Sequence, residues 1–229
     1  MSEFKREYLT RQADIIPIEA TNERITIIGA GGIGSNTAIS LARMGFSNLL
    51  VFDPDEVSDV NMNNQGYNIH DIGQPEVEAL QGKIKGIMGF DIDIEKRYFT
   101  ALSQAEGTVI MAVDSMSARK TIWSRSFNNA LVIDGRMASE YAIIYAIKPN
   151  DDRDRQEYTN SLFDDESANR EACTAKATIY TTNLISGLIC KIVKDWVLEN
   201  PYMQKVSWDI KNNDLNIRTS KGGFIARMK

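Results

Sequence analysis

The stretch Ile25-Thr-Ile-Ile-Gly-Ala-Gly-Gly-Ile-Gly34 decides the fold class of this chain. Its four apolar or β-branched residues predict a buried strand, and the glycines that follow predict a tight turn. Residues 33–44 then have the spacing of an amphipathic helix. Gly29, Gly31 and Gly34 fill a G-x-G-x-x-G pattern in the strand, turn and helix context that this pattern requires. We therefore expect an α/β fold that begins here.

The glycine-rich turn indicates a nucleotide site. Any side chain in it would hold a phosphate away from the backbone N–H groups at the helix N-terminus. Asp53 follows at about the spacing expected for a ribose-binding acid. It ends the apolar run of residues 48–52, where a carboxylate can accept hydrogen bonds from ribose hydroxyls. The alternative interpretation is a bare structural turn.

Apolar runs and helical patterns alternate along the rest of the chain, as in an α/β protein. We expect a Rossmann-like, mostly parallel sheet with helices on both faces and a C-terminal antiparallel β-hairpin extension. A helix should begin near Pro75. Further strands are expected at residues 93–98, 109–113, 131–134 and 142–147, and a hairpin at 205–218.

One domain of residues 1–229 accounts for the chain length. Within it we expect an N-terminal arm (1–22), a nucleotide-binding core (23–149), a mobile crossover segment (150–172), and a C-terminal helix and hairpin (173–229). The crossover segment is charged and rich in turn-forming residues without an apolar period, which favours a long loop over a strand–helix pair.

The segment after the glycine motif identifies a family. It contains Asp53-Pro-Asp55-Glu-Val57, then Asn61 to Gln65, and then Asp71-Ile-Gly73-Gln-Pro75-Glu76. This resembles the ThiF/MoeB/HesA pattern G-x-G-G-x-G-S, D-x-D-x-V-x-x-x-N-x-x-R-Q and D-[VI]-G-x-x-K. The resemblance covers residues 8–145 well and 173–198 more loosely. These proteins are bacterial relatives of ubiquitin-activating enzymes that adenylate the C-terminal carboxylate of a small ubiquitin-like protein.

The resemblance implies an adenylyltransferase that uses ATP and magnesium. It assigns the metal to Asp114, which follows the apolar run of residues 108–113. It assigns to Arg11 a contact with the ATP of a partner subunit, and therefore implies a homodimer, with a small ubiquitin-like carrier protein as partner. The expected nucleotide-binding residues are Gly29, Gly31, Gly32, Gly34, Asp53, Asp55, Asn61, Asn64 and Gln65.

Two positions depart from the family pattern. Asn64 stands where the family has arginine, and Glu76 stands where it has lysine. Together these changes remove about three units of positive charge, and unit charges near a surface interact by about 4 kcal/mol at contact distance. Lys83 or Lys85 is a candidate replacement, although both are more simply interpreted as solvated helix residues. The chain is then either an adenylating enzyme with rearranged phosphate contacts or a non-catalytic nucleotide-binding module.

Cysteine and histidine usage limits the other chemistry. Cys173 and Cys190 are the two cysteines, so a four-cysteine structural zinc site is excluded. Cys173 is either a nucleophile that forms a thioester, as in some family members, or a small buried residue. Cys190 is expected in the core. The single histidine, His70, is expected in a solvated turn, and no serine–histidine–acid set supports a hydrolase.

Composition narrows the remaining classes. The formal net charge of −5 gives no support for a nucleic-acid surface. Residues 177–190 are the most apolar, but this run is too short to span a bilayer and is expected to form a core helix. No signal or transit pattern is visible, so we expect a cytoplasmic protein.

The alternative interpretation as an NAD-dependent oxidoreductase is supported by the glycine motif alone. Asp134 also follows an apolar run but precedes Gly135, so it is ranked below Asp53 and Asp114 and expected to cap a turn.

Overall fold

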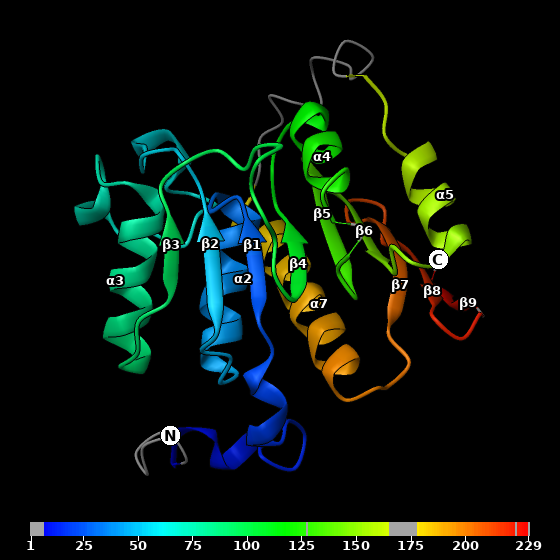
Figure 1. Ribbon diagram of the computed structural model, residues 1–229, viewed down its shortest axis with the longest axis horizontal. Coiled ribbons are helices and arrows are strands. Elements are labelled where there is room, and N and C mark those ends of the chain that lie inside the picture. Colours follow the sequence, from blue (N-terminus) through cyan, green and yellow to red (C-terminus); the bar gives the residue numbers. More distant parts are fainter. Residues whose placement is uncertain (1–6, 127, 165–177, 223, 229) are drawn as a thin grey trace.

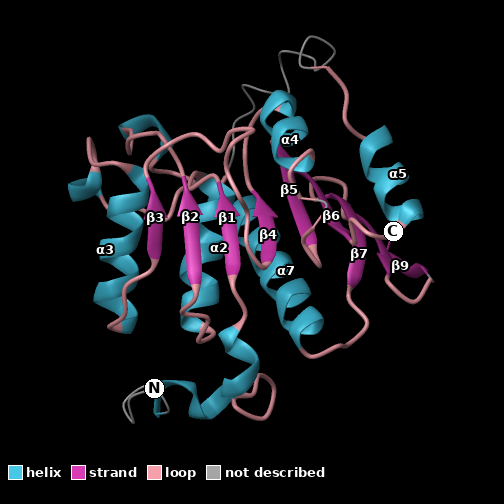
Figure 2. Ribbon diagram, in the orientation of Figure 1, coloured by secondary structure: helices cyan, strands magenta, loops and turns pink. Residues whose placement is uncertain are grey.

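The computed structural model describes residues 7–126, 128–164 and 178–222, and the backbone of residues 224–228. Within these ranges nine strands form one sheet in the order β3-β2-β1-β4-β5-β6-β7-β8-β9 (Figures 1 and 2). The strands are β1 (Ile25–Ile28), β2 (Leu49–Phe52), β3 (Asp93–Glu95), β4 (Thr108–Met111), β5 (Val132–Ala138), β6 (Tyr141–Ile147), β7 (Met203–Asp209), β8 (Asp214–Thr219) and β9 (Phe224–Met228). The α-helices are α2 (Gly32–Arg43), α3 (Glu76–Met88), α4 (Met116–Trp123), α5 (Asp152–Asn160) and α7 (Ile179–Val197).

The sheet has a parallel half and an antiparallel half. Strands β3, β2, β1, β4 and β5 are parallel, and every later pairing from β5 to β9 is antiparallel. The expected α/β class, the Rossmann-like sheet and the C-terminal β7–β8 hairpin are therefore confirmed. Strand β6 pairs with β7 and so joins the hairpin to the main sheet.

Helices cover both faces of the sheet. On one face α2, α3 and α7 contribute to a core cluster with the inward residues of β1 and β2, such as Ile27 and Val51. On the other face α4 and α5 pack Trp123 and Tyr158 against Met111 and neighbouring residues. Covering both faces explains why β1 is buried along its whole length and has no polar alternation.

The strand order reverses between β1 and β4, because β2 and β3 lie on one side of β1 while β4 and β5 lie on the other. In open parallel sheets, ligands bind in the crevice at the carboxyl ends of the strands at such a switch point. The glycine motif joins β1 to α2 at this point.

The crossover segment contains a helix that the sequence did not predict. Helix α5 begins after Asp151, whose Oδ1 accepts hydrogen bonds from the amides of Arg153 and Asp154 at 2.9 and 3.0 Å. Tyr158 anchors the helix, since it is 1% exposed and makes edge contacts with Trp123 and Tyr145. One buried aromatic in nine residues leaves almost no apolar period, so the expectation of a long irregular segment was wrong for Asp152–Asn160. Residues 165–172 lie outside the described ranges.

The apolar run before residue 190 forms helix α7, as expected. Its buried face includes Ile185, Ile189 and Cys190 and packs against α2, and Cys190 is 4% exposed. The expectation that Cys190 lies in the core is confirmed. In the part of the chain that the structure describes, no helix is long and apolar enough to cross a membrane.

The N-terminal segment lies at the end of the sheet opposite the glycine motif (Figure 1). It contains two 3₁₀ turns, Thr10–Gln12 and Ile18–Asn22. Gln12 donates a hydrogen bond from Nε2 to the carbonyl of Met44, just past the last residue of α2, at 2.7 Å. Helix α2 has 12 residues, which corresponds to a length of about 18 Å. Arg11 is exposed at this far end of α2.

Candidate functional site

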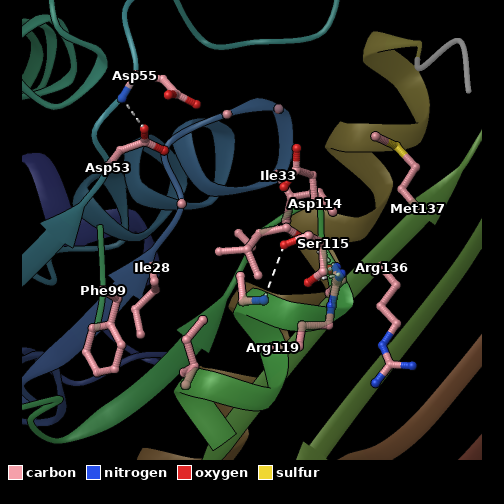
Figure 3. A pocket seen from close by; sticks show the side chains of 18 of the residues that line it. Ile28, Ile33, Asp53, Asp55, Phe99, Asp114, Ser115, Arg119, Arg136 and Met137 are labelled. Atoms are coloured by element: carbon pink, nitrogen blue, oxygen red, sulfur yellow. Dashed lines mark hydrogen bonds between the residues drawn. The ribbon is translucent and has the colours of Figure 1, made fainter. Parts of the chain in front are cut away.

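A pocket of about 1070 Å³ opens at the carboxyl ends of the parallel strands (Figure 3). It brings together nine residues that the sequence singled out. These are Gly29, Gly31, Gly32, Asp53, Asp55, Asn61, Gln65, Glu76 and Asp114. Gly34, Asn64 and Arg11 do not line it.

The glycines of the motif have different roles. Gly29 has φ +99°, and a Cβ there would lie 2.5 Å from the carbonyl oxygen of Ala112. A Cβ at Gly34 would lie 1.8 Å from the carbonyl oxygen of Gly29, so this glycine allows α2 to start against β1. At Gly31 the nearest neighbour would be Nε2 of Gln65 at 3.7 Å. Gly31 therefore leaves open space beside the pocket, while Gly29 and Gly34 permit close backbone packing.

Asp53 fixes the geometry between β2 and the glycine loop. Its Oδ2 accepts a hydrogen bond from the amide of Ala30 at 2.6 Å, and its Oδ1 accepts from the amide of Asp55 at 2.8 Å. The side chain is 7% exposed. Burial raises the pKa of its carboxyl, although the two backbone hydrogen bonds oppose that effect.

Gln65 and Glu76 form a buried pair beside the glycine loop. Nε2 of Gln65 donates to Oε1 of Glu76 at 2.9 Å. Glu76 is 3% exposed at the first residue of α3, and its amide donates to the carbonyl of Asp55 at 2.9 Å. Burial, followed by repulsion from Asp53, raises the pKa of the Glu76 carboxyl to about 7. Oε1 of Gln65 is buried and has no hydrogen-bond partner in the described part of the chain.

Asn64 and the two lysines do not bring positive charge to the pocket. Asn64 lies beside Gly32, and its buried Oδ1 lacks a hydrogen-bond partner among the described residues. Lys83 donates to the carbonyl of Gly66 and to Oδ1 of Asn68. Lys85 is exposed and pairs with Asp91 at 3.0 Å. The interpretation of Lys85 as a solvated helix residue is confirmed, and Lys83 is held by loop oxygens outside the pocket.

Asp114 lies in the pocket just past the end of β4 and is exposed to solvent. Figure 3 shows its side chain on the same side of the pocket as the glycine loop. Its negative charge raises the pKa of Asp53 slightly, after burial and Asp55. Within the described ranges, no group of three or more His, Cys, Asp or Glu side chains is placed to hold a metal ion. A cation bound by Asp114 would need further ligands from a bound molecule or water.

A charged network in the pocket wall was missed at the sequence level. Asp134 is fully buried, and it accepts from Nε of Arg119 at 3.0 Å, from Nε of Arg136 at 2.5 Å and from the hydroxyl of Tyr158 at 2.9 Å. The expectation that Asp134 caps a turn was wrong, because its side chain points into the core between α4 and α5. Arginines carry no periodic signal in a sequence, so the network was not visible there.

Ion pairs in the pocket wall offset most of the positive charge in the pocket. Among the described residues, the lining contains five carboxylates and three arginines. Two of those arginines, Arg119 and Arg136, share Asp134, and Arg97 pairs with Glu95 at 2.9 Å. The pocket is therefore negative where a phosphate-binding site is expected to be positive.

Other predicted residues lie elsewhere. His70 is exposed in the turn Ile69–Asp71, which confirms a surface role. Cys173 lies outside the described residues, so the thioester and core alternatives for it stay predictions.

A sequence model of the ThiF family matches residues 18–221, which is most of the chain. The chain belongs to the ThiF family. Among curated proteins, it resembles the NEDD8-activating enzyme E1 catalytic subunit of Arabidopsis thaliana, with 32% identity over 108 residues, 43% of this chain and 23% of that protein. It also resembles the tRNA threonylcarbamoyladenosine dehydratase of Bacillus subtilis, with 36% identity over 67 residues, 29% of this chain and 26% of that protein. The matches thus span about a quarter of these two relatives.

Solved structures of this fold cover nearly the whole chain. PaaA has a TM-score of 0.77 at 17% identity, covering 99% of this chain and 76% of that one. MccB of E. coli, solved with ATP, has a TM-score of 0.70 at 12% identity, covering 96% of this chain and 71% of that one. These likenesses show the fold, and they place the ThiF-family chain in the architecture that its motifs predicted.

Proposed function

We propose that this ThiF-family protein is an ATP-dependent adenylyltransferase that activates a carboxylate, such as the C-terminus of a small ubiquitin-like carrier protein. The observation that supports it best is the open space at Gly31, with Asp53 and Asp114 lining the same pocket at the strand ends. Family membership adds support, as does the structural likeness to MccB, which was solved with ATP and with AMPCPP plus MccA.

In this proposal each part of the pocket has one task. The amides at the start of α2 bind phosphate oxygens, because a helix N-terminus presents free N–H groups and a partial positive charge. Asp53 accepts hydrogen bonds from the ribose, with Asp55 and Asn61 on the same wall. Asp114 fits a magnesium ion, since it is an exposed carboxylate with no hydrogen bond or ion pair to another described residue. Magnesium, when bound, neutralises phosphate charge.

The reaction that we propose is an in-line displacement. An oxygen of the acceptor carboxylate forms a bond to the α-phosphorus, and the bond from that phosphorus to the bridging oxygen breaks, so pyrophosphate leaves. The chain contributes mainly by holding the two reactants in line, which can remove a large part of the entropic cost of activation. We further propose a homodimer in which Arg11 reaches the partner's nucleotide. Cys173 is the candidate for onward transfer to a thioester.

A second candidate is a non-catalytic nucleotide-dependent binding module. The specific observation in its favour is the buried carboxylate of Glu76 and the neutral Asn64 where the family has two cations. Without those cations, pyrophosphate leaves with less electrostatic help.

Exchange of labelled pyrophosphate into ATP separates the two candidates, because adenylation is reversible. An adenylyltransferase exchanges label when its carboxylate acceptor is present, and Asp114→Asn abolishes the exchange. Asn64→Arg combined with Glu76→Lys should raise ATP affinity or exchange by at least about tenfold, since tenfold corresponds to only about 1.4 kcal/mol. Glu78→Lys, which makes the same charge change as Glu76→Lys but at an exposed position of α3, is the control. ATP binding without exchange in native and restored proteins would favour the binding module.

A further inference from the structure

At the phosphate end of the pocket, Glu76 stands where the family has lysine, and it lies next to the neutral amide of Gln65. Glu76 and Gln65 are 3% and 8% exposed, and both line the pocket. The amide of Gln65 lies 3.7 Å from the position that a Cβ of Gly31 would take. Nε2 of Gln65 is the atom nearest to the loop, and it links the loop region to the Glu76 carboxylate, so a neutral amide and a carboxylate lie where phosphates are expected.

Gln65 has an unsatisfied oxygen at this place. Its Nε2 is used by Glu76 at 2.9 Å, while Oε1 is buried without a hydrogen-bond partner within the described ranges. An unpaired buried acceptor costs about 1–3 kcal/mol, and native proteins rarely retain one without a ligand or a functional reason. The oxygen is thus available to a hydrogen-bond donor or a cation that arrives with the nucleotide.

The negative charge of the pocket favours a cation over a neutral hydrogen-bond donor as the partner of this oxygen. Five carboxylates line the pocket, and the nucleotide brings further negative charge on its phosphates. Arg119 and Arg136 are both paired with Asp134, which offsets one of their two positive charges. Magnesium is commonly held by one or two carboxylates together with phosphate oxygens and water, and it needs no cage made only of protein ligands. The Glu76 carboxylate and the unpaired oxygen of the Gln65 amide that is hydrogen-bonded to it suit that chemistry.

We propose that Glu76 and Gln65, together with the nucleotide phosphates, form a second divalent-cation site that replaces the two basic side chains of the family. The proposal rests on the proposed binding of ATP. The site is separate from Asp114, because Asp114 follows β4 on one side of β1, while Glu76 begins the helix that leads from β2 to β3 on the other side. One divalent ion restores two of the roughly three charge units that the substitutions remove.

Counting manganese ions tests this directly. Manganese replaces magnesium in oxygen sites and is detected by electron paramagnetic resonance. With α,β-methylene ATP bound, the native protein should hold two manganese ions per nucleotide. Glu76→Lys should hold one and still bind the nucleotide, because the lysine supplies the charge. Gln65→Leu should also lose the second ion, and Asp114→Asn should lose the other one. Glu78→Lys should keep both, and thermal unfolding checks that each variant is folded.

The dependence of nucleotide affinity on magnesium gives a second readout. Both magnesium concentrations should be high enough to saturate the nucleotide itself. A tenfold rise in free magnesium should then tighten binding to the native protein by up to about tenfold, and binding to Glu76→Lys by less than about twofold.

The outcomes distinguish this site from the proposed function. One manganese ion per nucleotide in the native protein, or two ions retained in Glu76→Lys, would overturn the second site and leave ATP binding intact. A native protein that binds no nucleotide at any magnesium concentration would contradict the proposed function and the second site together.

Discussion

The amide of Ala30 donates a hydrogen bond to Oδ2 of Asp53 at 2.6 Å, and this bond joins the glycine loop to the end of β2. The other carboxylate oxygen accepts from the amide of Asp55 at 2.8 Å. An ionised carboxylate has about four lone-pair positions, so each oxygen can still accept a ribose hydroxyl. One side chain therefore holds the loop in shape and presents acceptors to a ligand.

Asp53→Asn should lower both stability and nucleotide affinity. An amide has one acceptor oxygen, so its NH₂ group must face the N–H of either Ala30 or Asp55. A buried donor left without an acceptor costs about 1–3 kcal/mol, which urea unfolding measures. Asp55→Asn is the control, since the Asp55 side chain is exposed and its change should leave stability within about 0.5 kcal/mol. Equal stability of Asp53→Asn and the native protein would contradict the role of Asp53 in holding the glycine loop in shape.

Gly31 and Gly34 should respond differently to the same substitution. Gly31→Ala adds a methyl group that meets nothing closer than 3.7 Å, so the protein should fold normally and lose nucleotide affinity. Gly34→Ala places a methyl group 1.8 Å from the carbonyl of Gly29, so it should destabilise the fold itself by at least about 1–3 kcal/mol. Thermal unfolding with and without ATP measures both effects. Loss of folding in Gly31→Ala would refute the assignment of open space there.

The sequence was sufficient for the parallel half of the fold. Residues 25–28 predicted β1 because both faces of that strand are covered, and the glycines predicted the start of α2 because Gly34 permits close helix–strand contact. Most of the residues that the family pattern names reach one pocket, since the carboxyl ends of parallel strands lie at one edge of the sheet.

The remaining features of the fold and the site depend on tertiary contacts and could not be predicted from the sequence. Helix α5 is anchored by Tyr158 and a capping carboxylate, which leave no apolar period. Asp134 ends an apolar run just as Asp53 does, but two arginines from different elements enclose it. The orientation of Arg119 and Arg136 toward one carboxylate follows from packing between α4 and β5, which no local pattern encodes.

Asp134→Asn should be among the most destabilising single changes in the pocket wall. It leaves Arg119 and Arg136, with side chains 5% and 11% exposed, without their shared counter-charge. Removing one partner of a buried ion pair typically costs about 3–5 kcal/mol. Asp164→Asn is the control, because Asp164 pairs with Lys120 at an 82% exposed position, where a pair contributes about 0–1 kcal/mol. Similar urea midpoints for the two variants would contradict the structural role of Asp134.

The Glu76 carboxyl should make apo-protein stability fall as pH rises. Burial raises its pKa from 4.5 to about 7, so between these values the folded state holds the proton and the unfolded state does not. Stability is lost as pH rises through this window, by about 3 kcal/mol in total if the whole shift is expressed. Without nucleotide or divalent ions, Glu76→Gln should match the native protein near pH 4 and exceed it at pH 8. Parallel stability curves from urea unfolding would show that Glu76 is ionised in the folded state across this range.

Arg11 should act in the site of the other subunit. It is exposed at the end of α2 remote from the glycine loop, so it cannot reach the pocket of its own chain. In a twofold dimer each subunit gives and receives the same contact.

A mixing experiment tests this role of Arg11. Arg11→Ala and Asp114→Asn should each impair pyrophosphate exchange alone. When they are mixed and allowed to exchange subunits, half of the dimers are heterodimers with one intact site each, so about a quarter of native activity should return. The control for mixing itself is a mixture of two differently labelled preparations of Arg11→Ala. Heterodimers that form without any recovery, or a native protein that sediments as a monomer at micromolar concentration, would remove this role for Arg11.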